Sequence, residues 1–234
     1  MFNKRVAPRN VPKHIGIILD GNGRWATKRG LPRNYGHRKG VEAIFRTIEA
    51  SLKFGIKYMS VFAFSTENWK RSKEEIDGIF SLVKEFFESE IDKIVTSGVK
   101  INFFGDLTAF SEDIREVLYK AVDLSKNNNK LTFNMCLNYG GKQDIVQSVN
   151  NLISNGKKMI TEQDISDNLY SKGMPDLDFV IRTSGEERLS NFMIYQAAYA
   201  ELYFPKVLWP DFNEKELWKA LVVYSKRKRR FGGY

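Results

Sequence analysis

Short apolar runs alternate along the chain with longer segments in which apolar residues recur at helical spacing. The runs are rich in β-branched and aromatic residues and end at glycine or polar residues, which is typical of strands. Several are apolar at nearly every position, as expected for parallel strands covered on both faces. They predict strands at residues 15–19, 58–64, 100–104, 131–137, 179–181 and 202–204.

The clearest helical pattern follows Ser72. Ser72 and Glu75 have the spacing of a capping box, and an apolar stripe continues from there to Gly98. Further helices are predicted at residues 40–53, 111–125, 142–154, 161–170, 191–200 and 214–229. The alternation predicts an α/β fold: a single domain with a mainly parallel central sheet of about six strands, flanked by helices.

The length of 234 residues and the lack of a linker-like segment favour one domain, at residues 13–234, preceded by a basic arm at residues 1–12. A chain of this size buries enough apolar surface to fold without disulfides. Its one cysteine, Cys136, lies inside an apolar run and is interpreted as a core side chain. A lone thiol is typical of a reducing compartment.

No segment has the pattern of a secretory signal or a membrane span. The apolar run that begins at Ile15 ends at Asp20, far too soon to cross a bilayer. We therefore expect a cytoplasmic protein without a transmembrane segment.

The formal net charge is +9, with a pI of about 9.4. Such an excess fits nucleic acid, an anionic membrane or phosphorylated small molecules. The arginines do not form one basic stripe, and no groove-reading motif is present, which disfavours nucleic acid. Their position relative to the strands is more informative than their number.

Polar, glycine-rich and basic residues follow several predicted strands, at residues 20–25, 65–71, 138–141 and 182–188. In an open α/β sheet, ligands bind outside the carboxyl ends of the strands. These segments therefore predict one site at one edge of the sheet.

The first of these segments begins with Asp20, a carboxylate at the end of a buried strand, which suits a hard cation such as Mg²⁺. Gly21 and Gly23 allow the backbone to approach an anion closely. Arg24 and Arg33 could add charge-assisted hydrogen bonds, although an ordinary Asp-Gly turn explains the same letters. His37 could touch a phosphate or simply cap a helix.

The segment after the fifth strand carries Arg182, Arg188 and Ser190, placed before a predicted helix whose amino end would favour anions. Two arginines can hold a diphosphate through several hydrogen bonds. Glu201 is either a second metal ligand or a surface carboxylate. No P-loop, zinc spacing or nucleophile elbow occurs in the sequence.

Together these segments resemble the motifs of the cis-prenyltransferase family, of the undecaprenyl diphosphate synthase kind. The matching blocks run in order from residue 13 to residue 233: 14–26, Gly36-His37 with Gly40, 64–71, 138–141, 178–188, 198–212 and 229–233. The aspartate-rich pattern of the all-helical trans-prenyl synthases is absent.

The resemblance implies a homodimeric, Mg²⁺-dependent enzyme that adds isopentenyl diphosphate units to an allylic diphosphate such as farnesyl diphosphate. It implies that Asp20 is the catalytic and metal-linked carboxylate, and that Glu201, perhaps from the partner subunit, completes the metal site. The implied allylic diphosphate ligands are Gly21, Asn22, Gly23, Arg24, Trp25, Arg33 and His37, and those of isopentenyl diphosphate are Arg182, Arg188 and Ser190.

Ser65, Asn68, Trp69 and Arg71 resemble the family's mobile active-site loop, in which Ser65, Asn68 and Arg71 would take a catalytic part and Trp69 would contact substrate. The segment at residues 230–232 resembles the terminal motif that reaches across the dimer. One departure is Ser184, which stands where the family often has glycine.

Ala63 is small and precedes the loop motif, so it would leave room for a growing chain in an apolar tunnel. This favours a long product, undecaprenyl diphosphate for a cell-wall lipid carrier, over a medium-chain one. Release of so apolar a product would involve peripheral contact with a membrane. A non-catalytic partner subunit of the same family should lack the Asp20 loop or the Arg182–Arg188 pair, and this chain keeps both.

Overall fold

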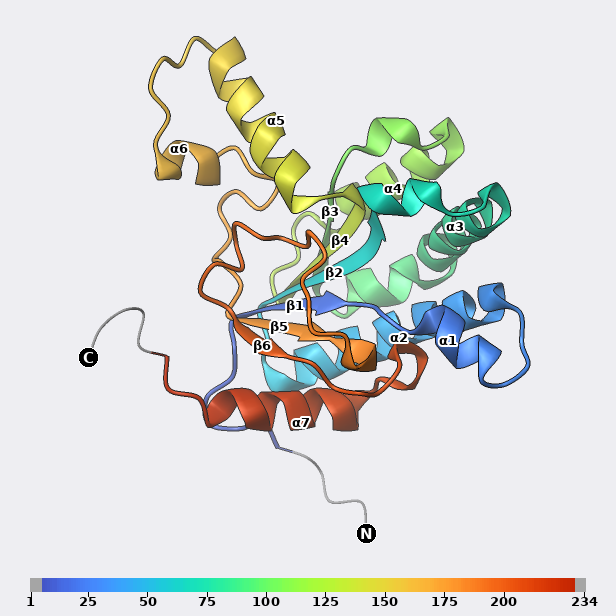
Figure 1. Cartoon of the computed structure of the whole chain (residues 1–234). Helices are drawn as coiled ribbons and strands as arrows, with labels where there is room; N and C mark the ends of the chain where they lie inside the picture. The colour runs from blue at the N-terminus through green and yellow to red at the C-terminus, as the bar shows by residue number, and fades with distance from the viewer. Residues whose placement is uncertain (1–5, 230–234) are drawn as a thin grey trace.

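The computed structural model describes residues 6–229, and its centre is a six-stranded sheet, as predicted (Figure 1). The strands are β1 (His14–Ile18), β2 (Tyr58–Ser65), β3 (Val99–Phe104), β4 (Leu131–Tyr139), β5 (Phe179–Arg182) and β6 (Glu201–Tyr203). They lie in the order β3-β4-β2-β1-β5-β6, and every neighbouring pair is parallel.

The register of the strands brings four carboxyl ends to one edge. Ile18 at the end of β1 is paired with Phe62 of β2 on one side and with Arg182 of β5 on the other, and Phe62 is paired with Cys136 of β4. The polar segments that follow β1, β2, β4 and β5 therefore start side by side, as the sequence predicted.

The helices are α1 (Asn22–Thr27), α2 (Arg33–Phe54), α3 (Lys73–Thr96), α4 (Glu112–Ser125), α5 (Gly141–Ser154), α6 (Glu162–Ser166) and α7 (Glu214–Ser225). Short 3₁₀ turns are η1 (Thr66–Lys70), η2 (Leu107–Ala109), η3 (Thr183–Gly185) and η4 (Trp209–Asp211). Helices α2, α3, α4 and α7 supply buried side chains to the larger core cluster, which covers one face of the sheet.

Helix α2 begins at Arg33, seven residues before the predicted start at Gly40, and it ends as predicted at Gly55, which is left-handed with φ 79°. Gly40 is a contact point and does not start the helix. A Cβ on Gly36 would lie 2.1 Å from the Asn22 carbonyl oxygen, and one on Gly40 would lie 2.4 Å from Asn22 Oδ1. These glycines let α1 pack directly against α2.

The helix predicted at residues 191–200 is wrong, because this segment is a series of turns. Ser190, Asn191 and Met193 have positive φ angles of 49°, 66° and 39°, which a right-handed helix cannot contain. The turns insert Phe192 and Met193, both fully buried, into a second core cluster on the opposite face of the sheet. Tertiary packing therefore overrides the helical pattern here.

Two other predicted helices are shorter in the structure. The helix expected at residues 161–170 ends at Ser166, and the one expected at residues 214–229 ends at Ser225. None of the helices in residues 6–229 is long and apolar enough to cross a membrane.

The end of the basic arm is described from residue 6, and it contacts the domain where the indole nitrogen of Trp218 donates to the Val6 carbonyl oxygen at 3.0 Å. Cys136 is fully buried in the second cluster, where burial raises the pKa of its thiol. This agrees with the interpretation of Cys136 as a core side chain.

His14, at the start of β1, is a buried titratable group. Its Nδ1 lies 2.7 Å from the Pro175 carbonyl oxygen and its Nε2 lies 2.8 Å from Ser60 Oγ, which also accepts from Asn134. The neutral ring satisfies these contacts, donating through Nδ1 and accepting from the Ser60 hydroxyl. Burial lowers the pKa of His14 from 6.5 to about 4.

This depressed pKa predicts an acid-sensitive fold. Above pH 6.5 His14 is neutral in both states and costs nothing, whereas below it the unfolded chain binds the proton first. Stability should therefore fall between pH 6.5 and pH 4 by about 1.4 kcal/mol per unit from this residue. Urea unfolding of the wild type and of His14→Asn at several pH values measures this, and an equal slope for both would contradict it.

Candidate active site

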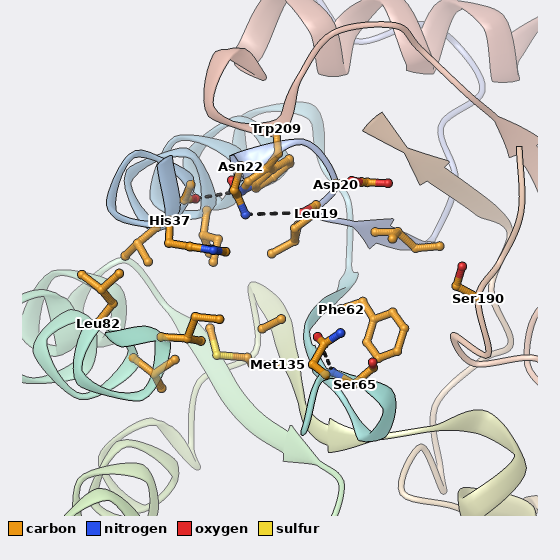
Figure 2. A pocket seen from close by; sticks show the side chains of 18 of the residues that line it. Leu19, Asp20, Asn22, His37, Phe62, Ser65, Leu82, Met135, Ser190 and Trp209 are labelled. Carbon is orange, nitrogen blue, oxygen red and sulfur yellow. Dashed lines mark hydrogen bonds between the residues drawn. The ribbon is translucent and has the colours of Figure 1, made fainter. Parts of the chain in front are cut away.

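A cavity of about 620 Å³ opens at the carboxyl edge of the sheet and extends between α2 and α3 (Figure 2). Its polar part is lined by Asp20, Asn22, His37, Ser65, Glu67, Asn68, Arg71, Arg182, Ser190 and Asn191, and its apolar part by residues that include Val41, Ile44, Ala63, Leu82, Val83, Phe86 and Met135. Figure 2 shows Leu82 and Ser190 on opposite sides of the cavity in that view. Polar and apolar walls thus belong to one continuous space.

Asp20 follows β1 and is fixed by its backbone. Its N–H donates to Thr183 Oγ1 at 3.0 Å, and the same hydroxyl donates to the Asp20 carbonyl oxygen at 2.6 Å. The carboxylate accepts from Arg24 at 3.0 Å through Oδ1 and from Arg182 at 2.9 Å through Oδ2. Burial by itself would raise the pKa of Asp20, but the hydrogen bonds from both arginines outweigh it and lower the pKa. Asp20 is therefore ionised at neutral pH.

Arg182 is the most buried cation of the site, with 5% of the residue exposed. Its Nη1 donates to Ser190 Oγ at 2.7 Å and to the Arg188 carbonyl oxygen at 2.6 Å. The structure thus brings together Asp20, Arg182 and Ser190. It does so through turns, so the predicted contribution of a helix amino end to this site is wrong.

The remaining predicted arginines of this part lie at the rim. Arg188 has a side chain 60% exposed and pairs with Glu186, which also accepts from Arg24 at 2.8 Å. Neither Arg24 nor Arg188 lines the cavity itself. Glu186 was not predicted, although its place between Arg182 and Arg188 in the sequence is a signal that could have found it.

A second cluster gathers around Glu75, in the first turn of α3. One carboxylate oxygen of Glu75 accepts from Arg33 at 3.3 Å, from His37 at 3.1 Å and from Arg71 at 3.1 Å. Burial would raise the pKa of Glu75, but the hydrogen bond from His37 and the positive charges of Arg71 and Arg33 outweigh it and lower the pKa. The pKa of His37 is lowered, mainly because the ring is buried. An ionised carboxylate thus holds Arg33 and His37, both predicted to bind the allylic diphosphate, together with Arg71 of the predicted active-site loop.

The capping box predicted at Ser72 is half correct. The Ser72 hydroxyl accepts from the Glu75 N–H at 3.3 Å, but the Glu75 side chain points to the cluster instead of returning to the cap. Its position one helical turn after Arg71 is the signal that sequence analysis missed.

Ser65 and Asn68 line the cavity and hold each other. They form the capping box of η1, in which the Ser65 N–H donates to Asn68 Oδ1 at 3.1 Å. Trp69 does not line the cavity. Its side chain is 40% exposed and lines a neighbouring groove against α3, and its indole nitrogen donates to Asn138 Oδ1 at 2.7 Å.

The glycine-rich segment after Asp20 is the start of α1. Gly21 has φ 112°, and a Cβ there would lie 2.9 Å from a Leu208 methyl carbon, so only glycine fits. Gly23 faces the Arg33 guanidinium. Asn22 lines the cavity, and its buried Oδ1 has no hydrogen-bond partner. Trp25 instead points away, with its indole nitrogen donating to Asp211 at 2.7 Å.

Glu201 is not brought to Asp20 within one chain. It is the first residue of β6 and is paired in register with Phe179, at the amino end of the sheet. Its carboxylate accepts from Arg227 at 2.6 Å. Within residues 6–229 no group of three or more His, Cys, Asp or Glu side chains could hold a metal ion. A metal at Asp20 would need other ligands, such as substrate oxygens and water.

The fold and the site together indicate the kind of ligand that the cavity accepts. An ionised carboxylate lies among guanidinium groups at one end of a cavity whose other end is apolar. Such a space accepts a molecule with an anionic head and an apolar tail.

The comparisons with known proteins specify the class. The chain matches the prenyltransferase family described as "Putative undecaprenyl diphosphate synthase" over residues 18–232, and it belongs to that family. It is 46% identical to the isoprenyl transferase of Clostridium perfringens, over 95% of this chain and 90% of that one. It is 44% identical to the ditrans,polycis-undecaprenyl-diphosphate synthase ((2E,6E)-farnesyl-diphosphate specific) of Pasteurella multocida, with 97% of each covered. The resemblance inferred from the motifs is confirmed.

Solved structures show the same fold. Lavandulyl diphosphate synthase from Lavandula x intermedia, in complex with dimethylallyl diphosphate, superposes with a TM-score of 0.91 at 33% identity, over 95% of this chain and 98% of that one. A probable undecaprenyl diphosphate synthase from Campylobacter jejuni gives a TM-score of 0.80 at 29% identity, over 95% and 99%.

The Glu75 cluster predicts how the site responds to an added anion. Glu75→Gln should bind inorganic pyrophosphate about 3- to 10-fold more tightly, because Arg33, His37 and Arg71 no longer face an internal carboxylate. Isothermal titration calorimetry measures the affinity.

Glu85→Gln is the matched control on the same helix. Glu85 pairs with Arg38 at the surface, where both side chains are 54% exposed, and such a pair contributes little. Unchanged or weaker pyrophosphate binding by Glu75→Gln would show that Glu75 does not compete with anions.

Proposed function

We propose that this prenyltransferase adds isopentenyl diphosphate units to an allylic diphosphate, farnesyl diphosphate, with cis double bonds, and makes undecaprenyl diphosphate. The observation that carries the proposal is the single cavity that joins Asp20 and its arginines to an apolar wall containing Ala63. The name of the Pasteurella multocida relative supports the primer and the product. The complex of the Lavandula synthase with dimethylallyl diphosphate supports an allylic diphosphate ligand in this fold.

The two diphosphates bind at the two clusters. The allylic diphosphate lies against the Gly21–Arg24 backbone and receives hydrogen bonds from Arg33 and His37, with Arg71 beside them. Isopentenyl diphosphate lies against Arg182, Arg188 and Ser190. Both tails then point from the polar end of the cavity toward its apolar end.

The reaction forms a carbon–carbon bond between the two tails while the allylic carbon–oxygen bond breaks. Negative charge develops on the departing diphosphate, so the arginines around it stabilise the transition state more than the ground state. The cavity holds the two reacting carbons close, which supplies the orientational part of the acceleration.

A proton must then leave the condensed intermediate. Three acceptors are available at this end of the cavity: the ionised Asp20 carboxylate, a water that the unpaired Asn22 Oδ1 would hold, and the released diphosphate. Ser65 and Asn68 line the same region and keep η1 in place over the reacting carbons.

The donor set around Asp20 suits Mg²⁺. Asp20 Oδ1 accepts one hydrogen bond, from Arg24, and keeps a further lone pair, whereas Oδ2 accepts two from Arg182. A carboxylate with few other protein ligands is typical of magnesium that shares substrate phosphates. When bound, Mg²⁺ neutralises charge on the diphosphate oxygens. Glu201 would join Asp20 from a second copy of the chain in a homodimer. Peripheral contact with a membrane would serve product release.

Loss of the Asp20 carboxylate tests the proposed reaction. Asp20→Ala should reduce incorporation of radiolabelled isopentenyl diphosphate into product by at least about 100-fold, because the carboxylate that orients Arg24 and Arg182 is lost. Asp123→Ala, at an exposed pair on α4, is the control. Equal incorporation by the wild type and Asp20→Ala would refute the role of this carboxylate.

The length of the product tests the apolar wall. Ala63→Leu adds bulk to the cavity wall and should shift the products to shorter chains, seen by thin-layer chromatography, with the first condensations retained. Ala109→Leu, on the exposed η2 turn, should leave the chain length unchanged. A wild type that stops at a medium-chain product, or an unchanged pattern for Ala63→Leu, would contradict the tunnel assignment.

A further inference from the structure

Ser184 has a left-handed backbone in the η3 turn. Its φ is 76° and its ψ is 6°, a conformation that costs free energy for any residue with a Cβ and little for glycine. The next residue, Gly185, has φ 74°. The chain therefore keeps a side chain at a position where glycine would be unstrained, which indicates that the serine hydroxyl has a role.

The serine hydroxyl is not needed to form the turn. The Ser184 N–H donates to the Val207 carbonyl oxygen at 2.7 Å, and the Gly185 N–H donates to the Pro205 carbonyl oxygen at 2.9 Å. Thr183 fixes the other end of the turn through its hydrogen bonds with the Asp20 backbone. These contacts would remain with glycine or alanine at position 184.

The hydroxyl instead contacts the catalytic centre. Ser184 Oγ accepts from Arg24 Nη2 at 2.6 Å, and the same nitrogen donates to Asp20 Oδ1 at 3.0 Å. The other Arg24 nitrogen, Nη1, donates to Glu186 at 2.8 Å. The Arg24 side chain is 45% exposed, so fixed acceptors are what hold its guanidinium in one place.

We propose that Ser184 is a positioning residue, whose hydroxyl holds the Arg24 guanidinium beside Asp20, ready to receive a diphosphate. This inference rests on the proposed function. A guanidinium fixed before binding loses less conformational freedom when the anion arrives, and that gain offsets the strain of a serine in a left-handed turn.

Two substitutions separate the hydroxyl from the strain. Ser184→Ala removes the hydroxyl and keeps the strained Cβ, whereas Ser184→Gly removes both. Both variants should therefore bind inorganic pyrophosphate about 3- to 10-fold more weakly and raise the KM for farnesyl diphosphate to a similar extent, with kcat changed less. Ser184→Gly should nevertheless melt at a higher temperature than Ser184→Ala, because it alone relieves the turn.

Arg24→Lys tests whether the effect passes through Arg24. Lysine keeps the positive charge but lacks the planar guanidinium with which Arg24 contacts Asp20, Ser184 and Glu186 at once. Adding Ser184→Gly to Arg24→Lys should therefore cost no further pyrophosphate affinity. Without substrate, the ¹⁵N signal of the Arg24 side chain should report greater mobility in Ser184→Ala than in the wild type. Ser81→Ala, which removes a hydroxyl on the exposed side of α3, should match the wild type in both measurements.

Tighter or unchanged pyrophosphate binding by both Ser184 variants would overturn the proposal, as would an equal loss in the Arg24→Lys background or an unaltered Arg24 signal. These outcomes differ from failure of the proposed function. That failure is a wild type that makes no prenyl product, and it leaves the pyrophosphate titration and the Arg24 signal readable.

Discussion

The site depends on the pairing of Asp20 with Arg182. Arg182 ends β5 and is almost completely buried, and a guanidinium in that place is tolerated only when a carboxylate and further acceptors satisfy it. The parallel register of β1 and β5 brings the two residues together, so the sheet itself positions the charges. Thr183 then fixes the Asp20 backbone, and Asp20 in turn orients Arg24.

The strands were predictable because runs such as 15–19 have no polar side chain on either face and leave few alternatives. The prediction of a helix at residues 191–200 was wrong, because nothing in the sequence of this segment indicates the positive φ angles with which the turns bury Phe192 and Met193. Asp20, Arg182 and Ser190 were found because they lie at the ends of strands or in the segments that follow them. Glu75 was missed because its spacing from Ser72 already had a local explanation, and long-range packing decides where its carboxylate points.

The positive charge of the chain is locally balanced at the site. Asp20, Glu75 and Glu186 each accept from two or more cationic side chains, so internal carboxylates hold the arginines in place. Under the proposed function, an entering diphosphate replaces these carboxylates as the anionic partner of the arginines. The cations therefore need not be gathered from solvent at the moment of binding, which is the physical meaning of a preorganised site.

Helix α2 carries both ends of the cavity. His37 lies among the cations and Ile44 lies on the apolar wall, seven residues along the same helix, which corresponds to about 10 Å of axial rise. Gly36 and Gly40 let this helix pack directly against α1. The polar and apolar walls of the cavity are therefore held at a fixed spacing. Under the proposed function, each added isoprene unit would move along a fixed path while the diphosphate end stays in place, and the far end of that path would set the length of the product.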